Sequence, residues 1–261
     1  TSAQNPKIKK LAALMEKSRE RRETGLFAVE GKRELLHCLN AGFMSHTVFI
    51  CPDILSEKDT EEIISGCGCP VIEVPRHLYE KIAYRGSTEG VIAELYCKMN
   101  SLEDLKLKDN PLLIVLEAVE KPGNLGAVLR SADASGADAV IICDPLTDLY
   151  NPNLIRSSIG ASFTVPTVAV TSEEAIGWLK EKGIKIYTAQ LQDSRWYYDT
   201  DMTGGTAIVM GTESTGLTDI WRKAADAHIK IPMLGRLDSL NVSVSAAILL
   251  FEAVRQRNAG K

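Results

Sequence analysis

The chain has 261 residues, of which 45% are hydrophobic and 25% charged, proportions typical of a soluble globular protein. No stretch approaches the roughly 18 uninterrupted apolar residues of a membrane-spanning helix, and the polar, basic start at 1–10 lacks the apolar core of a signal peptide. These features argue against a membrane protein and predict a cytoplasmic one.

Charge is distributed unevenly along the chain. The net charge is −4, yet residues 1–33 contain nine Lys or Arg against four Glu, a balance of +5 that leaves −9 for the remainder. A local basic patch attracts phosphates and releases their counterions, which makes this segment a candidate RNA contact. The candidate residues are Lys9, Lys10, Arg21, Arg22 and Arg33. A solvated helix face is the alternative, and charge alone does not decide between the two.

The cysteines predict no metal site. Cys67 and Cys69 are one residue apart, whereas zinc-binding pairs are separated by two to four residues, and no second pair follows. Most of the six cysteines lie in apolar stretches, as reduced core cysteines do in an intracellular protein.

Residues 1–98 alternate helical and strand-like patterns. Apolar residues at helical spacing predict a helix over 7–23, which Gly25 ends. The further expected elements are a strand at 27–29, a helix at 33–39, a strand at 47–51, a helix from a capping box at 56–59 to 64, a strand at 71–74, a helix at 77–83 and a strand at 90–96. This order predicts a small α/β domain over 1–98.

Residues 99–110 are polar and charged, which predicts a linker before a second domain at 111–261. That domain begins with a continuous apolar run at 112–116, the mark of a strand buried on both faces. The elements expected after it are a helix at 125–135, a strand at 139–143, a helix beginning at Asn151-Pro152, a strand at 164–170, a helix at 173–182, strands at 184–188 and 206–210, a helix near 219–225, a strand at 229–231 and a final helix. Strand–helix alternation predicts a doubly wound parallel sheet.

The final helix carries apolar residues at steps of three and four, which predicts one buried face. The residues of that face are Val244, Ile248, Phe251 and Val254. Before it, Ser239 and Asn241 are suited to capping the helix, because their side chains accept hydrogen bonds from free amides of the first turn.

Three segments follow expected strands of the second domain: 124–136, 209–217 and 231–257. In an open α/β sheet, ligands bind beyond the carboxyl ends of the strands, so these segments predict the site. Other site types fit poorly. Leu217 occupies the position of the phosphate-binding lysine of a P-loop, the stretch 211–216 is one residue too long for a nucleophile elbow, and no dinucleotide-binding glycine pattern follows an early strand.

In order and spacing, the three segments resemble the signature motifs of the TrmH (SpoU) family within the SPOUT class of RNA methyltransferases, and 27–31 resembles the beginning of that family's RNA-binding domain. The resemblance implies a C-terminal parallel α/β sheet with a deep trefoil knot, and a smaller N-terminal α/β domain similar to ribosomal-protein RNA-binding modules. It also implies S-adenosylmethionine as cofactor, a homodimer formed through the C-terminal domain, and methyl transfer to a ribose 2′-hydroxyl of structured RNA. 23S ribosomal RNA is favoured as the substrate.

By this resemblance, three residues would contact S-adenosylmethionine: Gly211, Ile231 and Leu240. The matching active-site positions are Asn124, Arg130, Glu213, Ser239 and Asn241. Arginine stays protonated below about pH 12, so we interpret Arg130 as a cation that binds phosphate and stabilises developing alkoxide charge, not as a base. Glu213 would orient it, with a purely structural ion pair as the alternative. Arg156 resembles a further family element near the target nucleotide.

Two interpretations stay open. Exposed aromatic residues at 196–198 either stack on RNA bases or cover a dimer interface. The alternative functions are a transfer-RNA 2′-O-methyltransferase and a non-catalytic RNA-binding ribosome-assembly factor that keeps the fold.

Overall fold

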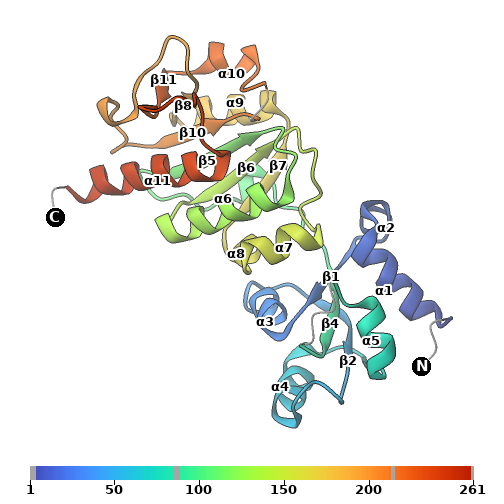
Figure 1. Ribbon diagram of the computed structural model, residues 1–261. Coiled ribbons are helices and arrows are strands. Elements are labelled where there is room, and N and C mark those ends of the chain that lie inside the picture. The colour runs from blue at the N-terminus through green and yellow to red at the C-terminus, as the bar shows by residue number, and fades with distance from the viewer. Residues whose placement is uncertain (1–3, 85–88, 213–214, 260–261) are drawn as a thin grey trace. The chain divides into compact units, whose positions relative to one another are not determined.

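The computed structural model describes residues 4–84, 89–212 and 215–259 (Figure 1). The chain divides into two compact units. The first comprises Thr1–Lys98 and Asp148–Thr164, and the second Met99–Thr147 and Val165–Lys261. Residues 148–164 lie within the sequence range expected for the second domain, yet they are part of the first unit.

A four-stranded sheet in the order β1-β4-β2-β3 forms the centre of the first unit. Its strands are β1 (Leu26–Glu30), β2 (Ser45–Ile50), β3 (Val71–Glu73) and β4 (Val91–Tyr96). Its helices are α1 (Pro6–Glu16), α2 (Ser18–Thr24), α3 (Lys32–Asn40), α4 (Glu57–Cys67), α5 (Arg76–Ile82), α7 (Pro152–Ser158) and α8 (Ala161–Thr164). One apolar core joins α1 and α5 to the sheet, and another joins α3, α4, α7 and α8 to its opposite face.

The predicted helix over 7–23 is two helices. Lys17 adopts an extended conformation, with φ −111° and ψ 116°, which ends α1 and starts α2. Gly25 ends α2 in the left-handed conformation, as expected, at φ 65°.

The return segment α7–α8 is held by aromatic packing. Phe163 of α8 stacks on Phe27 of β1 with ring centroids 5.9 Å apart and meets Phe43 edge-on at 5.3 Å. Ile155 of α7 is buried in the same core. These contacts link residues more than 100 positions apart in sequence, which explains why local patterns did not assign the segment to the first unit.

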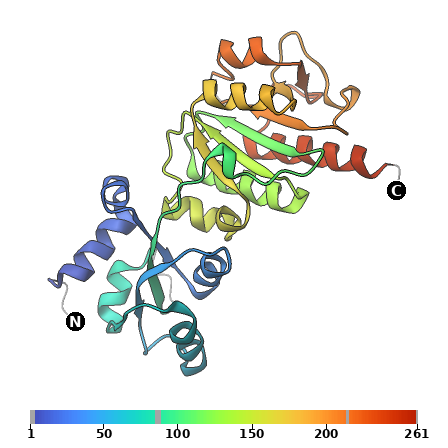
Figure 2. The ribbon, with the colours of Figure 1, turned by 180° about the vertical axis from the view of Figure 1, so that it is seen from behind.

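Seven parallel strands form the second unit's sheet in the order β7-β6-β5-β10-β8-β11-β9, which confirms the predicted parallel α/β class. The strands are β5 (Leu112–Glu117), β6 (Ala139–Cys143), β7 (Thr167–Val170), β8 (Lys185–Ala189), β9 (Arg195–Trp196), β10 (Thr206–Met210) and β11 (Ala227–Lys230). The helices are α6 (Pro122–Ser135), α9 (Ser172–Glu181), α10 (Asp219–Ala224) and α11 (Val242–Asn258). Helices α6 and α11 pack together on one face of the sheet, and α9 and α10 cover the other (Figures 1 and 2).

The expected linker is packed structure. Its residues form a short 3-10 turn, η2 (Leu102–Asp104), and Leu102 is buried in the core of the second unit. Leu105 and Leu107 pack against the same core. The polar composition of 99–110 therefore hides three apolar anchors that attach the segment to the second unit.

The prediction of the buried face of α11 is wrong for the single chain. Val244 and Phe251 are 47% and 46% exposed, and the residues buried instead include Ala246, Leu249 and Ala253 on the other side of the helix. Apolar residues occupy both sides of α11, so periodicity alone did not select the buried one. An apolar stripe is consequently left on the surface of the unit.

Candidate active site

The carboxyl ends of β8, β10 and β11 surround a cavity of about 410 Å³ in the second unit. The segment just before α11 closes it. Four residues predicted from the sequence line this cavity together: Gly211, Ile231, Ser239 and Leu240. Its volume lies in the range of small-molecule and cofactor sites, roughly 300–1,000 Å³. Residues predicted to contact S-adenosylmethionine therefore share a cavity suited to it.

Glycine at position 211 is required by a close approach of two backbone segments. A Cβ atom at Gly211 would lie 2.3 Å from the carbonyl carbon of Gly216 and 2.5 Å from the amide nitrogen of Leu217. Thr212 and Gly216 are bridged as in a tight hairpin, with Gly216 at φ 67°. The backbone at Gly211 and the backbone at Gly216 thus lie against each other at the border of the cavity.

A second cavity, of about 280 Å³, adjoins the first. It is lined by Asn124 at the start of α6 and by Glu120 and Lys121 before it. Both cavities are bordered by Gly211–Thr212 and by Val242. The two cavities therefore share a border formed by Gly211, Thr212 and Val242.

Two asparagines join the first and third motifs. The Asn241 Nδ2 atom donates a hydrogen bond to Asn124 Oδ1 at 3.1 Å. Asn241 also caps α11, because its Oδ1 accepts from the Ser243 amide at 3.0 Å and from the Ser243 hydroxyl at 2.6 Å. The capping role predicted from the sequence is confirmed for Asn241. The same side chain thereby fixes the amide of Asn124 at the edge of the second cavity.

Arg130 is not brought to this site by its own chain. It is exposed on α6, lines neither cavity, and forms no ion pair with any residue that the structure describes. Its expected partner, Glu213, lies outside the described residues. Of the predicted site residues of the three motifs that the structure describes, all except Arg130 line one of the two cavities or, like Asn241, bond to a residue that does.

Glu117, which no sequence motif indicated, holds the end of a segment that borders the cavity. This buried carboxylate ends β5, and its Oε2 accepts from the Thr218 amide at 2.8 Å. Its Oε1 accepts from the hydroxyls of Thr218 at 2.5 Å and Ser172 at 3.4 Å, and Ser172 accepts from the Trp221 indole at 2.9 Å. Glu117 thus fixes the residue that follows the 211–217 loop. An acidic residue that ends an otherwise apolar strand was the available signal.

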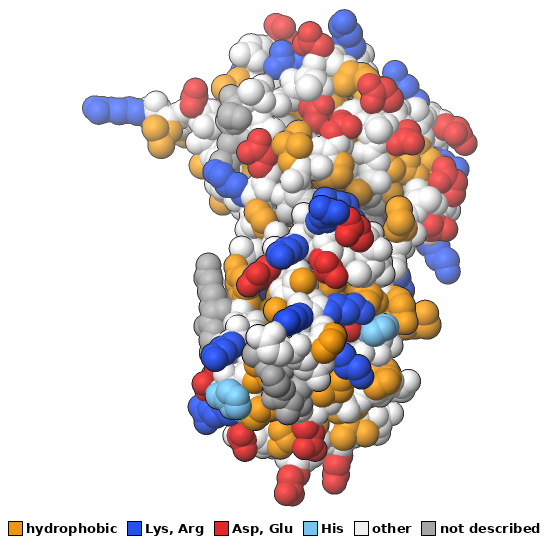
Figure 3. Space-filling view, turned by 90° about the vertical axis from the view of Figure 1, so that its right-hand side faces the viewer, with side chains coloured by type: hydrophobic (Ala, Val, Ile, Leu, Met, Phe, Trp, Pro, Cys, Tyr) orange, Lys and Arg blue, Asp and Glu red, His pale blue; other side chains and the backbone are white. Residues whose placement is uncertain are grey.

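The basic residues of the first unit differ in their positions. Lys9, Arg22 and Arg33 are exposed, and Figure 3 shows Lys and Arg side chains on the face that carries α1 and α2. The structure corrects the prediction that Arg21 contacts RNA. Arg21 is only 3% exposed, its Nε donates to Asp148 at 2.5 Å and its Nη1 to the Leu14 carbonyl, so it stabilises the fold and does not meet a phosphate.

Lys10 is partly buried beside an interior carboxylate. Its Nζ lies 3.8 Å from Glu94 Oε2, which also contacts His46 Nδ1 at 2.9 Å. Burial raises the pKa of the Glu94 carboxyl, against the opposing effects of Lys10 and His46. Lys10 therefore also has an internal partner, unlike Lys9.

The remaining residues predicted to contact RNA or a second protein copy lie on the surface, one of them in the first unit and the others in the second. Arg156 is exposed on α7 and lines a cavity of the first unit. In the second unit, Trp196 and Tyr198 are 40% and 47% exposed and stack at a ring separation of 6.5 Å, with Lys230 Nζ over Trp196 at 4.8 Å. A surface of this kind suits either RNA bases or another protein surface.

Comparison with known proteins identifies both units. Residues 111–251 match the sequence model of the SpoU rRNA Methylase family, and residues 5–93 match the MRM3-like substrate binding domain. The 23S rRNA (guanosine-2′-O-)-methyltransferase RlmB of Vibrio parahaemolyticus is 37% identical over 201 residues, 75% of this chain and 81% of that protein. The 23S rRNA (guanosine(2553)-2′-O)-methyltransferase RlmP of Bacillus subtilis is 28% identical over 250 residues, 96% of each chain.

A solved structure resembles the whole chain. The SpoU methyltransferase AviRb of Streptomyces viridochromogenes, in complex with AdoMet, superposes with a TM-score of 0.92 at 27% identity, covering 99% of this chain and 100% of that one. Together with the sequence matches, this structure confirms the resemblance stated from the motifs, the α/β fold and S-adenosylmethionine as the cofactor.

Proposed function

The chain belongs to the SpoU rRNA methylase family, and from this membership we propose that it methylates a ribose 2′-hydroxyl of 23S ribosomal RNA. The observation that carries the proposal is the pair of cavities that share Gly211–Thr212 and Val242 as a border, with Asn124 at one and the predicted cofactor residues at the other. These relatives are named as 23S rRNA methyltransferases, and their names supply the substrate class.

The larger cavity fits S-adenosylmethionine. The tight turn at Gly211 leaves backbone free of side chains, and Ile231 and Leu240 offer apolar walls for an adenine. The bound cofactor supplies a methyl group on a positively charged sulfur. We assign cofactor contacts to Gly211, Ile231 and Leu240.

The smaller cavity would receive the ribose of the target nucleotide. Asn124 and Asn241, fixed by their mutual hydrogen bond, would orient the 2′-hydroxyl for in-line attack, and Ser239 borders the neighbouring cofactor cavity. Positioning of this kind contributes much of the rate of a displacement reaction. Arg130, oriented by Glu213, would bind the nucleotide phosphate and stabilise the charge developing on the oxygen.

A homodimer explains two features of the second unit. The exposed apolar residues Val244 and Phe251 on α11 are suited to burial against a second copy, and Arg130 lines neither of the two cavities of the site among the described residues. In this proposal, the copies pair through the second unit and Arg130 serves the partner's site. The last helix completes the trefoil knot of the SPOUT class, the first unit holds the RNA, and the protein acts in the cytoplasm.

Transfer of a methyl label tests the reaction. Wild-type protein, labelled S-adenosylmethionine and separate samples of 23S, 16S and transfer RNA should yield label at one ribose 2′-oxygen of 23S RNA only. Asn124→Ala should abolish transfer, while Asn40→Ala, at an exposed position at the end of α3, should not. Label in transfer RNA, or cofactor binding without any transfer, would contradict the proposed substrate.

Mixed dimers test the shared site. Arg130→Ala and Asn124→Ala should each be inactive alone, whereas coexpressed chains should regain activity, because one site of each mixed dimer keeps Asn124 from one copy and Arg130 from the other. Mixtures as inactive as the separate variants would place Arg130 in its own chain's site or leave the protein monomeric, and sedimentation would separate these outcomes.

A further inference from the structure

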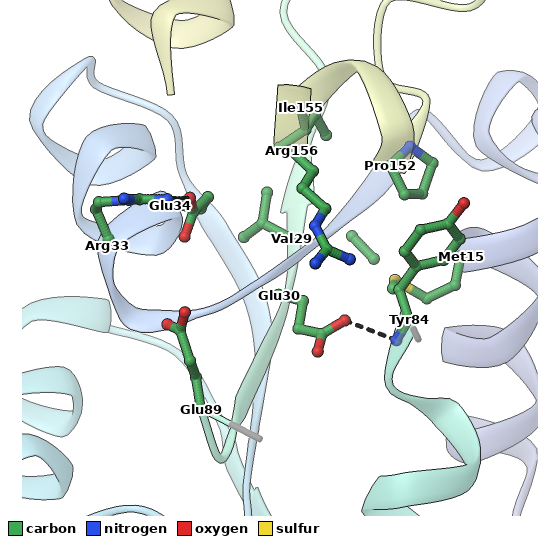
Figure 4. A pocket seen from close by; sticks show the side chains of 11 residues that line it. Met15, Val29, Glu30, Arg33, Glu34, Tyr84, Glu89, Pro152, Ile155 and Arg156 are labelled. Atoms are coloured by element: carbon green, nitrogen blue, oxygen red, sulfur yellow. Dashed lines mark hydrogen bonds and ion pairs between the residues drawn. The ribbon is translucent and has the colours of Figure 1, made fainter. Parts of the chain in front are cut away.

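The first unit contains a cavity that the methyl-transfer site does not use. Its volume is about 180 Å³, and it lies between β1, the start of α3, the residues after α5 and the start of α7 (Figure 4). At that size it suits one planar ring system, since cofactor-sized sites are roughly 300 Å³ or more. Met15, Val29 and Ile155 give it apolar walls, and Tyr84 borders one side.

Acceptor groups converge on one wall. A Cβ atom at Gly31 would lie 2.6 Å from Glu89 Oε2 and 2.7 Å from Glu34 Oε2, so the two carboxylates come together over a glycine that leaves room for them. Gly31 also has φ 105°, a conformation that favours glycine. Figure 4 shows Glu34 and Glu89 across the cavity from Tyr84, with Glu30 between them. Glu30 Oε2 is held in place by the Tyr84 amide at 2.7 Å.

Two arginine side chains, Arg33 and Arg156, also line the cavity. The Arg156 side chain extends from α7 into the cavity towards Glu30 (Figure 4), and it forms no ion pair among residues 4–84, 89–212 and 215–259. Arg33 is 59% exposed and pairs with Glu34 at 2.6 Å. The cavity is thus lined by adjacent carboxylate acceptors and by guanidinium donors.

This combination selects one kind of ligand. Neighbouring carboxylates call for a planar group with adjacent N–H donors, and guanine alone among the RNA bases presents two, N1–H and the 2-amino group, on its Watson–Crick edge. The attached phosphates would meet Arg33 and Arg156. A cationic peptide offers similar donors but would be repelled by the same two arginines.

We propose that this cavity binds an unpaired guanine of the RNA, as an anchor distinct from the methylated nucleotide; the inference rests on the proposed function in that the substrate is RNA. RNA is commonly recognised through single bases that leave the helix, stack on aromatic side chains and form hydrogen bonds along their edges. Tyr84 and the two glutamates offer both kinds of contact.

The experiment compares short single-stranded RNAs on the full chain. The pentanucleotide UUGUU should bind roughly 10-fold more tightly than UUAUU, the discrimination of a bidentate contact, and inosine in place of guanine should remove most of the gain. Glu89→Gln, at an exposed position, should bring the ratio near unity, whereas the equally exposed Glu61→Gln on α4 should leave it unchanged. Arg156→Ala should weaken all three RNAs alike and lower the salt dependence by about one phosphate contact.

Several outcomes would overturn the inference. These are equal affinity for UUGUU and UUAUU, a preference that survives Glu89→Gln, or tighter binding of N-acetylarginine amide than of guanosine monophosphate. The proposed function fails separately. A protein that methylates 23S RNA without preferring guanine loses only the anchor, and one that prefers guanine but transfers no methyl group loses only the enzyme activity.

Discussion

The two units differ in how their functional residues relate to the sequence. In the second unit, Asn124, Gly211 and Ile231 come from three separate motifs and border adjoining cavities. In the first, Arg21 and Arg22 are neighbours in one basic run, yet one is buried in an ion pair and the other is exposed. Motifs that follow the strands of a parallel sheet come together in space, because all of these strands end at the same edge of the sheet. A count of charges in a segment does not tell which of its side chains are exposed.

The largest expected effect separates those neighbouring arginines. Arg21→Ala would leave Asp148 and the Leu14 carbonyl without their donor inside the first unit, and we expect the free energy of unfolding to fall by about 3–5 kcal/mol. Arg22→Ala should change it by less than about 0.5 kcal/mol. Urea unfolding measures both.

RNA binding at several salt concentrations completes this comparison. Arg22→Ala should lower the slope of log affinity against log salt by roughly 0.7–0.9 if it meets one phosphate. Equal stability of the two variants would indicate that Arg21 lies on the surface with the other basic residues.

Gly211→Ala tests the close approach of two backbone segments beside the cavity proposed for the cofactor. The added Cβ would overlap the backbone of Gly216, and relief requires the loop to move, so affinity for S-adenosylmethionine should fall roughly 100-fold, about 2.7 kcal/mol. Gly177→Ala is the matched control, because a Cβ there meets nothing within 4 Å on the exposed side of α9, and the helix should gain up to about 1 kcal/mol. Calorimetric titration measures the affinities. Undiminished affinity in Gly211→Ala would place the cofactor elsewhere.

Much of the fold could be predicted from local patterns. The continuous apolar run at β5 and the alternation after it were sufficient for the parallel sheet, and the capping residues Asn151 and Ser56 marked helix starts that the structure confirms. The two-residue strand β9 is too short for any pattern to identify.

The unpredicted features depend on contacts between distant residues. Periodicity could not choose the buried side of α11, because Val244 and Leu249 are both apolar and the packing of α11 against α6, β5 and β10 decides between them. The cavity of the first unit needs Arg156 beside Glu30, and the segment that brings them together returns from more than 100 residues away. Motif resemblance predicted the candidate site residues, whereas Glu117 became evident only from its hydrogen bonds.

Buried carboxylates occur in both units, and the next variant tests Glu117 of the second unit. Glu117→Gln keeps the shape but replaces one acceptor oxygen by an NH₂ group, which would face the Thr218 amide or hydroxyl. We expect a loss of about 2 kcal/mol in unfolding free energy, the cost of unsatisfied buried donors, together with weaker cofactor binding. Glu173→Gln, exposed at the start of α9, should change neither. Normal cofactor affinity in Glu117→Gln would show that the 211–217 loop holds its shape unaided.

The smallest effect concerns Glu94, a buried carboxylate of the first unit. Glu117 accepts hydrogen bonds from hydroxyl and amide donors, whereas Glu94 Oε1 has no hydrogen-bond partner among the described residues, and burial raises the pKa of the group above 4.5. Between 4.5 and that raised pKa, the folded protein keeps a proton that the unfolded chain releases, so the free energy of unfolding should fall as pH rises.

Glu94→Gln should flatten that fall in urea unfolding measured from about pH 4.5 upward, while Glu61→Gln should retain it, because Glu61 is exposed. The comparison isolates the carboxyl proton, since both variants lose one acidic group from the same unit. Parallel curves for the two variants would mean that Lys10 and His46 compensate fully for burial of the charge. In that case Glu117 and Glu94 would be equally well satisfied. Glu117 would be stabilised by hydrogen bonds from hydroxyl and amide groups, and Glu94 by the charges of its neighbours.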